Sequence, residues 1–423
     1  MIKKFLFALI IFVLNVSTCA ANEEFDAAEI RFSCALCSFG AYSDENGAFV
    51  RSMLTADKWQ IETLSQKTKS VTTKAYLISK GDNMILTIAG TESIKDAEVD
   101  FRVGRVHLDG TPIVRKEKDS GDEIFVHKGF CNYTDAMLDN GLAERLTTSL
   151  KNNPNATLYI TGHSLGGAVA TLTAIRLIDS GVDKNRVKVI TFGAPAVGSK
   201  ALAAAYSDKI NLTRVEMKGD FIKKSLSELG YVQFGKVYTY TPSFTSKQFE
   251  HKVSVYLDCA IREYYAAGGD LLYENQGGIN ASIYVAPILV VKDSLHKTDA
   301  DIVLRTLNDI LGNHFSRLTF APEKSVELAE EDIIAKDFAA FASDARTHGC
   351  KYVLIRVLSS KKIRDAMSGE NRVTLEEYIL DASGSLLFMQ TSGSSTKDLT
   401  IIEIALISQE KLIESTTEFF KGK

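Results

Sequence analysis

The sequence predicts an α/β protein in two parts: a first domain with a mostly parallel sheet, followed by a smaller separate α/β domain. Three observations support this prediction. The chain has 423 residues, more than one ordinary domain. Short β-rich segments alternate with helical segments, which is typical of a parallel sheet covered by helices. A glycine-rich stretch at 266–280 separates two such patterns, so we expect a targeting segment at 1–21, domains at 22–265 and 281–423, and a linker between the domains.

The composition is that of an ordinary globular protein. Hydrophobic residues make up 45% of the chain and charged residues 24%, which leaves ample apolar material for a core. The 49 basic and 53 acidic residues give a net charge of −4. This balance indicates neither a nucleic acid nor an anionic membrane surface as a partner.

The first residues have the pattern of a secretory signal peptide. Lys3 and Lys4 precede an apolar run at 5–16, which ends in small residues at 17–21. The apolar run is short for a membrane span, so we expect cleavage after the small residues and export to the periplasm or the extracellular space. An uncleaved anchor and lipidation of Cys19 are the alternatives.

Five cysteines follow this segment: Cys34, Cys37, Cys131, Cys259 and Cys350. The number is odd, so at least one thiol stays free or pairs between chains. Cys34 and Cys37 have redox-motif spacing, but their surroundings are helical and no strand precedes them, so we expect a structural or reduced pair. No second cysteine or histidine pair has ligand spacing, so we expect no metal.

The first domain is expected to begin with a helical segment at 23–58, followed by strands and helices in alternation. The expected strands are 58–66, 72–80, 84–89, 106–108, 157–161, 187–192 and 210–217. The expected helices are 135–152, 165–180 and 199–207, with Asp135 favouring the N-terminus of the first. The polar segment 92–126 is expected to be mostly loop.

The second domain has its own pattern. The expected strands are 281–291, 315–320, 351–358 and a hairpin at 373–391, and the expected helices are 299–311, 330–347 and 399–421. This order resembles small envelope-associated domains of the TolB amino-terminal type. No catalytic constellation is found there, so the resemblance suggests a binding role with an unknown partner.

The segment Gly162-His163-Ser164-Leu165-Gly166 lies between a short β-rich strand and a long helix. A Gly-x-Ser-x-Gly turn in this context holds the serine above a strand end and beside a helix N-terminus, whose N–H groups favour developing negative charge. Ser164 is therefore the candidate nucleophile and the Leu165 N–H a candidate oxyanion donor. His163 is expected to pack or hydrogen-bond beside them. The alternative is a glycine-rich turn with no chemistry.

A nucleophilic serine needs a base, which follows the serine and the acid in the chain in this architecture. The histidines after the serine are His251, His296, His314 and His348. Only His251 precedes the linker, at the start of an alternating segment, 252–257, that we expect to be a strand. His251 is the candidate base, and an ordinary surface histidine is the alternative.

The candidate acid is Asp220, because it follows directly after the expected strand 210–217. Its rivals Asp179, Asp183 and Asp208 stand at expected helix ends, where capping or solvation explains them. The second oxyanion donor should come from a turn after an earlier strand. Strand 84–89 ends in Gly90-Thr91, so Thr91 is the candidate, and a turn that only ends the strand is the alternative.

Several segments, taken together, resemble the class 3 lipase family of fungal-type triacylglycerol lipases and their bacterial relatives, over about residues 25–260. The matching segments are 86–91, 126–130, 160–168, 191–198, 214–220 and 249–251. The resemblance implies an α/β-hydrolase fold with a mobile lid. It also implies Ser164, Asp220 and His251 as the catalytic triad, and Thr91 and Leu165 as oxyanion donors.

Two positions depart from the family pattern. Ala89 stands where a large basic residue is usual, and Asp220 is followed by Phe221-Ile222-Lys223-Lys224 rather than by a proline-containing run. The segment 92–126 would hold the lid by position, and it lacks a strongly amphipathic helix. This favours shorter or more soluble esters.

The resemblance implies a secreted or periplasmic serine hydrolase that cleaves carboxylic esters of lipids through an acyl-enzyme on Ser164, without a cofactor. Triacylglycerol lipases, phospholipases and esterases all fit this description. The implied partners are a lipid or other ester substrate, with transient contact at a lipid interface. The alternatives are an acyltransferase and a non-catalytic envelope-binding protein that retains a hydrolase scaffold.

Overall fold

The computed structural model describes most of the chain and divides it into two compact units, Met1–Gly269 and Asp270–Lys423. The described residues are 23–42, 59–67, 72–90, 104–113, 123–139, 141–242, 250–269, 278–292, 303–304, 307–308, 311–312, 314–322, 325–335, 338–362, 371–395 and 401–421. The expected signal peptide at 1–21 lies outside them, as do 92–103 and 114–122 of the segment 92–126 that was expected to hold the lid.

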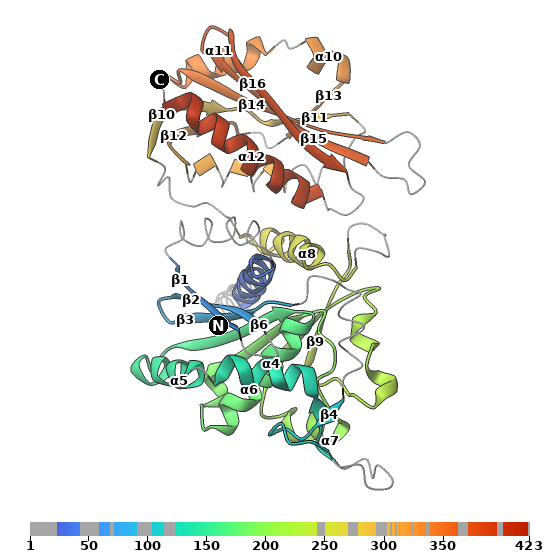
Figure 1. The fold of residues 1–423 in the computed structure, drawn as a ribbon. Helices are drawn as coiled ribbons and strands as arrows, with labels where there is room; N and C mark the ends of the chain where they lie inside the picture. The colour runs from blue at the N-terminus through green and yellow to red at the C-terminus, as the bar shows by residue number, and fades with distance from the viewer. Residues whose placement is uncertain are drawn as a thin grey trace, which may run out of the picture. The chain divides into compact units, whose positions relative to one another are not determined.

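The first unit is built on a seven-stranded sheet with the order β1-β2-β3-β6-β7-β8-β9 (Figure 1). An antiparallel meander of β1 (Gln60–Lys67), β2 (Thr72–Lys80) and β3 (Asn83–Ile88) forms one side. The other strands continue from β3 in parallel: β6 (Thr157–His163), β7 (Val187–Phe192), β8 (Asn211–Met217) and β9 (Lys236–Tyr240). The predicted α/β class with a mostly parallel sheet is confirmed.

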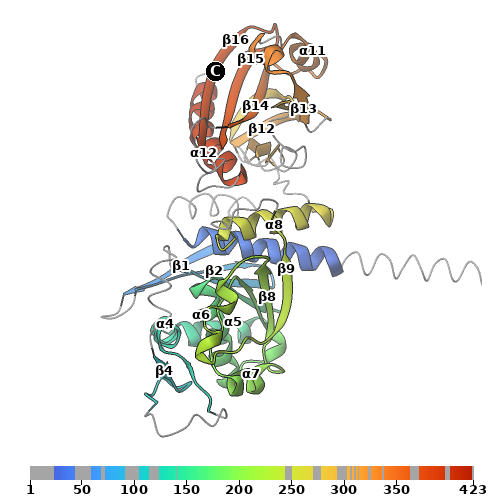
Figure 2. The ribbon, with the colours of Figure 1, turned by 90° about the vertical axis from the view of Figure 1, so that its right-hand side faces the viewer.

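Helices cover both faces of this sheet (Figure 2). On one face, the helix at 23–40 packs beside α8 (Val253–Ala266) through the Arg31–Glu263 ion pair and the stacked rings of Phe32 and Tyr264. The other face carries α4 (Lys128–Leu138), α5 (Leu142–Asn152) and α6 (Leu165–Asp179), while α7 (Lys200–Tyr206) follows β7 in the chain. The α6 helix is buried almost all round, which explains its small and apolar sequence.

Two elements predicted in this unit are wrong. The helix predicted at 135–152 is two helices, because Gly141 adopts a left-handed conformation (φ 79°) before α5. Asp135 therefore lies late in α4, where it pairs with Arg176 at 2.9 Å, rather than at a helix N-terminus. The segment 252–257, predicted as a strand, begins α8.

The second unit is a mixed sheet with helices on both faces. Its strands are β10 (Ile279–Val285), β11 (Ile288–Val291), β12 (Phe315–Phe320), β13 (Ser325–Leu328), β14 (Tyr352–Lys362), β15 (Asn371–Asp381) and β16 (Leu386–Ser395). Its labelled helices are α10 (Glu330–Ala335), α11 (Ala339–Thr347) and α12 (Ile401–Lys421). The α11 and α12 helices lie on opposite faces of the sheet (Figure 2).

This unit differs from the prediction in several elements. β10 and β11 both pair in parallel with β14, so they are two halves of one strand, interrupted at Pro287 because proline lacks the N–H that a ladder needs. The helix predicted at 330–347 is likewise two helices, α10 and α11. β13 and, in the first unit, β9 were not predicted at all.

The cysteines at positions 34, 37, 131, 259 and 350 are all buried free thiols. Burial raises the pKa of Cys34 to about 12, so its thiolate is scarce at neutral pH. Cys34 and Cys37 both lie as free thiols inside the helix at 23–40. Across the described parts of both units, no helix has the length and apolar character that crossing a bilayer requires.

Candidate active site

Ser164 stands on the turn between β6 and α6, in a conformation that L-residues avoid. Its φ of 55° is the only positive value for a non-glycine residue within the described segments. Such a conformation costs of order 1–3 kcal/mol and persists only where the surroundings hold it. The Ser164 N–H donates to the Phe192 carbonyl at 2.9 Å, which ties the turn to the end of β7.

The glycines of the turn allow three segments of backbone to touch. A Cβ on Gly162 would lie 2.6 Å from the Gly166 carbonyl oxygen, and a Cβ on Gly166 would overlap the carbonyl oxygen of Ile88 in β3. A Cβ on Gly167 would lie 2.8 Å from Ala194 Cβ. The Gly-x-Ser-x-Gly-Gly sequence is therefore a steric requirement of this turn.

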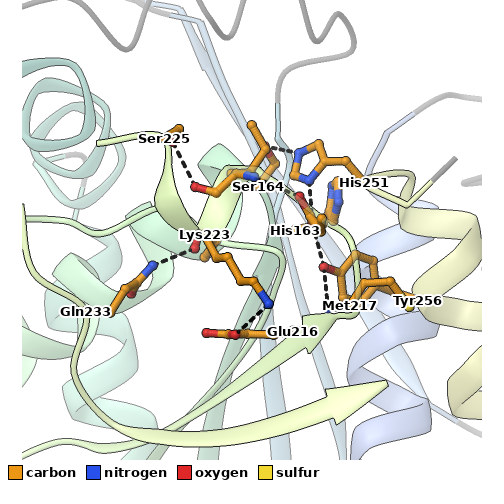
Figure 3. A network of polar contacts seen from close by, with 12 residues as sticks. His163, Ser164, Glu216, Met217, Lys223, Ser225, Gln233, His251 and Tyr256 are labelled. Atoms are coloured by element: carbon orange, nitrogen blue, oxygen red, sulfur yellow. Dashed lines mark hydrogen bonds and ion pairs between the residues drawn. The ribbon is translucent and has the colours of Figure 1, made fainter. Parts of the chain in front are cut away.

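Ser164, His251 and Asp220 form one hydrogen-bonded chain, of which Figure 3 labels Ser164 and His251. Ser164 Oγ lies 2.9 Å from His251 Nε2, and His251 Nδ1 lies 2.8 Å from Asp220 Oδ2. All three residues are buried, with exposures of 3%, 6% and 3%. The carboxylate fixes the tautomer with the proton on Nδ1, so Nε2 is free to accept the serine proton.

Two more donors hold the Asp220 carboxylate. The Ile222 N–H donates to Oδ1 at 2.9 Å, and the Tyr256 hydroxyl donates to Oδ2 at 2.6 Å. The same hydroxyl accepts from the Met217 N–H at 3.0 Å, which links the acid to the last residue of β8 (Figure 3). Three donors on one buried carboxylate compensate for its lost hydration.

Tyr256 was not among the residues predicted from the sequence. Burial, together with the nearby charge of Asp220, raises the pKa of Tyr256 well above its usual range, so the phenol remains a donor. Tyr256 was missed because the segment 252–257 was predicted as a strand, whereas it begins α8. A helical assignment would have placed Tyr256 about one turn after His251, within reach of the same site.

Gly193 was also missed as a site residue, although its segment was noted. It follows β7, has φ 56°, and carries no side chain that would crowd Asp220 or His251. A Cβ there would lie 2.7 Å from Asp220 Oδ2, 2.8 Å from the Tyr256 hydroxyl and 3.2 Å from His251 Nδ1. A side chain of any size would therefore displace the carboxylate or the imidazole.

His163 is buried among the rings of Tyr42, His251 and Tyr256, where the sequence predicted that it would pack. Its ring centroid lies 4.6 Å from that of His251, and its Nδ1 lies 2.5 Å from the Tyr42 hydroxyl. Burial lowers the pKa of His163 well below its ordinary value, and the neighbouring His251 adds to the effect. A neutral His163 keeps a second positive charge away from His251.

Of the two predicted oxyanion donors, Leu165 lies within the described residues and Thr91 does not. Leu165 is the first residue of α6, so its N–H precedes the first bonds of the helix, in which the Gly167 and Ala168 N–H groups donate to the Ser164 carbonyl at 3.0 and 3.2 Å. Thr91 lies outside the described residues, which end at Gly90 in that segment. A Cβ on Gly90 would lie 2.6 Å from the His163 carbonyl oxygen, so the end of β3 adjoins the Ser164 turn.

The other candidates for the acid and the base make contacts elsewhere or lie outside the first unit or the described residues. Asp179 accepts from the Tyr206 hydroxyl at 2.6 Å, and Asp183 caps a short helix by accepting from the Asn185 N–H at 3.0 Å. His314 and His348 belong to the second unit, and His296 lies outside the described residues. The described residues contain no group of His, Cys, Asp or Glu suited to a metal ion.

We predict that Gly193→Ala blocks the chemistry of Ser164 without unfolding the chain. The new Cβ displaces Asp220 or His251, and misplacement by about 1 Å can cost roughly a hundredfold in rate. The measurement is the rate at which a fluorophosphonate probe labels the protein. Gly181→Ala is the matched control, because Gly181 also has a positive φ (96°) but a Cβ there meets nothing within 4 Å. Equal labelling rates for both variants would contradict the prediction.

We predict that His163 makes the folded protein sensitive to mild acid. Its folded-state pKa is depressed, so its contribution to stability is complete above the unfolded value of about 6.5 and is lost as pH falls below it. The slope reaches about 1.4 kcal/mol per pH unit for one proton. Denaturant titrations at pH 7 and pH 5 should therefore give a smaller loss of unfolding free energy for His163→Gln than for the wild type. Identical losses would show that His163 does not titrate on unfolding.

Part of this chain matches a known protein family. Residues 85–229 match the family model for class 3 lipases. The chain is 40% identical to Lipase ZK262.3 of Caenorhabditis elegans over 76 residues, which cover 18% of this chain and 22% of that protein. It is 33% identical to the secreted mono- and diacylglycerol lipase A of Penicillium cyclopium over 132 residues, 28% of this chain and 43% of that protein.

A solved structure of a mutant of MDLA from Penicillium cyclopium aligns with a TM-score of 0.42 and 21% identity, covering 54% of this chain and 85% of that chain. The matches span less than half of the length of either curated relative. The family match includes Ser164 and Asp220 and ends before His251. The resemblance predicted from the sequence is confirmed over residues 85–229, which match the class 3 lipase family.

Proposed function

We propose that the first unit is a serine hydrolase that cleaves carboxylic esters of lipids through an acyl-enzyme on Ser164. The observation that carries the proposal is the hydrogen-bonded chain from Ser164 Oγ through His251 to Asp220, at 2.9 and 2.8 Å. The strained turn that presents Ser164, and the class 3 lipase region around it, add support. Ser164 is the nucleophile in this proposal, His251 the base and Asp220 the orienting acid.

The reaction proceeds in two halves. Ser164 Oγ attacks the ester carbonyl carbon while His251 Nε2 takes its proton, and Asp220 stabilises the resulting imidazolium. The C–O bond to the alcohol then breaks, and His251 returns the proton to the departing oxygen. Water attacks the acyl-enzyme by the same route in reverse, releasing a carboxylic acid and restoring Ser164. The N–H groups of Leu165 and Thr91 hold the oxyanion in both halves.

The proposed substrates are lipid esters: acylglycerols, phospholipids or simpler carboxylic esters. The Penicillium relative is named for mono- and diacylglycerols, which supports the acylglycerol class. Phe221 follows the acid directly, is 49% exposed, and has its ring 6.3 Å from that of His251. An exposed aromatic ring beside the base suits an apolar substrate or transient contact with a lipid interface.

We also propose that the protein is exported, to the periplasm or outside the cell. The basic and apolar pattern at 1–21 supports this proposal, as does the word "secreted" in the name of the Penicillium relative. The reaction described above needs no cofactor, because the side chains and backbone of the site supply the nucleophile, the base and the oxyanion donors.

We predict that a fluorophosphonate probe labels the wild-type protein and that Ser164→Ala abolishes the labelling. Ser227→Ala is the matched control, because it removes an exposed hydroxyl that only donates to the Lys224 carbonyl. His251→Ala should slow labelling by roughly 10⁴-fold or more, since the base and the nucleophile act as a unit. Absence of labelling in the wild type, or unchanged labelling in Ser164→Ala, would favour the non-catalytic envelope-binding alternative.

The weakly amphipathic segment 92–126 by itself favours shorter esters. We predict nevertheless that hydrolysis of nitrophenyl esters continues to long acyl chains, because the exposed Phe221 ring beside His251 offers an apolar contact. The expected result is activity on both butyrate and palmitate esters that is lost in Ser164→Ala. The assay is release of nitrophenol, with the palmitate ester dispersed in detergent. Activity that stops after short chains would reject a lipase in favour of an esterase, while the acyl-enzyme mechanism would stand.

A further inference from the structure

The second unit contains a basic depression that the proposed hydrolase chemistry does not use. It has a volume of about 370 Å³ and lies where β10 and β14 begin and α12 ends. These elements can be followed in Figure 1, with α12 in red. The volume is in the range of pockets that hold small ligands.

Irregular pairing of β10 opens this depression. On the β14 side, the ladder begins only at Ile283, which pairs with Tyr352. On the β12 side, Ile279 pairs with Phe315 and Ser282 with Arg317, so two residues of β10 oppose a single residue of β12. This is a β-bulge, a feature that redirects side chains and is common beside binding sites. The first residues of β10 therefore border open space rather than a continuous sheet.

Three cationic side chains from three different elements line the depression. They are Arg317 of β12, Lys351 immediately before β14, and Lys421 at the end of α12. The lining includes no acidic residue. Lys421 lies 3.6 Å from Glu418, an exposed pair worth little in water. Within the described segments, neither Arg317 nor Lys351 has an ion-pair partner, so positive charge is left facing the depression.

The wall beside these cations is aromatic and fixed by packing. Tyr352 and Phe420 meet edge to face, with ring centroids 5.1 Å apart. Phe420 also packs against Phe315 at 5.4 Å, and it is almost completely buried. Asn280 adds an amide with donors and an acceptor to the rim. The site thus combines convergent positive charge, a polar amide and a rigid apolar surface.

We propose that this depression binds a phosphate-ester group. A phosphate ester carries up to two negative charges and accepts hydrogen bonds on several oxygens from several directions, which matches cations that converge from separate elements. A single carboxylate is satisfied by one arginine fork and would leave the lysines unused. Free phosphate esters and phospholipid headgroups share this chemistry. The proposal is independent of the hydrolase activity.

The experiment uses the full-length exported chain carrying Ser164→Ala, so that lipid probes stay intact. Glycerol 3-phosphate is titrated calorimetrically, and flotation measures binding to phosphatidylcholine vesicles with and without phosphatidylglycerol. The test variants are Arg317→Gln, Lys351→Gln and the double variant, all at exposed side chains. Lys361→Gln is the control, because it removes the same charge from an exposed lysine of β14 that pairs with Glu330 and does not line the depression.

The expected result is that the double variant binds about tenfold or more weakly than the parent, the loss of roughly one charge-assisted hydrogen bond, while Lys361→Gln binds as the parent does. Binding of glycerol 3-phosphate identifies free phosphate esters as ligands. Binding confined to phosphatidylglycerol vesicles identifies a lipid headgroup. The proposal is overturned if neither probe binds, if the double variant binds unchanged, or if Lys361→Gln loses binding equally through diffuse charge. Fluorophosphonate labelling of the parent with Ser164 restored reports separately on the hydrolase.

Discussion

The first unit depends on one steric constraint, the contact of three backbone segments at the Ser164 turn. β3, β6 and α6 approach so closely that a Cβ on Gly162 or Gly166 would overlap the neighbouring main chain. This contact holds Ser164 at a φ of 55° and directs its hydroxyl out of the sheet, toward His251. The local strain is held by a buried hydrophobic core to which β3, β6 and α6 all contribute.

Around that turn, the buried polar groups support one another. Asp220 is tolerated in the interior because His251, Tyr256 and the Ile222 N–H all donate to it. His163 is tolerated because it stays neutral and contacts the Tyr42 hydroxyl, which follows the helix at 23–40. Removing one partner would leave another polar group buried without compensation, so the site and the packing around it are energetically one network.

The two units use opposite ends of their parallel strands. In the first, Ser164 and Asp220 of the proposed triad follow the carboxyl ends of β6 and β8, where parallel α/β sheets commonly place their sites. In the second, the basic depression lies at the beginnings of β10 and β14, opened by a bulge rather than by a change of strand order. At the first site, a strained backbone presents Ser164. At the second, exposed Arg and Lys side chains line the depression.

The sequence by itself determined the features that short-range patterns encode: the glycine-flanked turn at Ser164, the mostly parallel sheet, and the chain order of Ser164, Asp220 and His251. Only the tertiary structure decided the rest. The alternation at 252–257 is too short to separate strand from helix, and packing against the sheet made it the start of α8. Gly193 acquires its role from His251 and Tyr256, which lie 58 and 63 positions later in the chain. Tyr256 acquires its role from the Asp220 carboxylate, to which it donates. Hydrogen bonds and steric limits between such distant residues leave no periodic trace in the sequence, because they exist only once the sheet has brought the strand ends together.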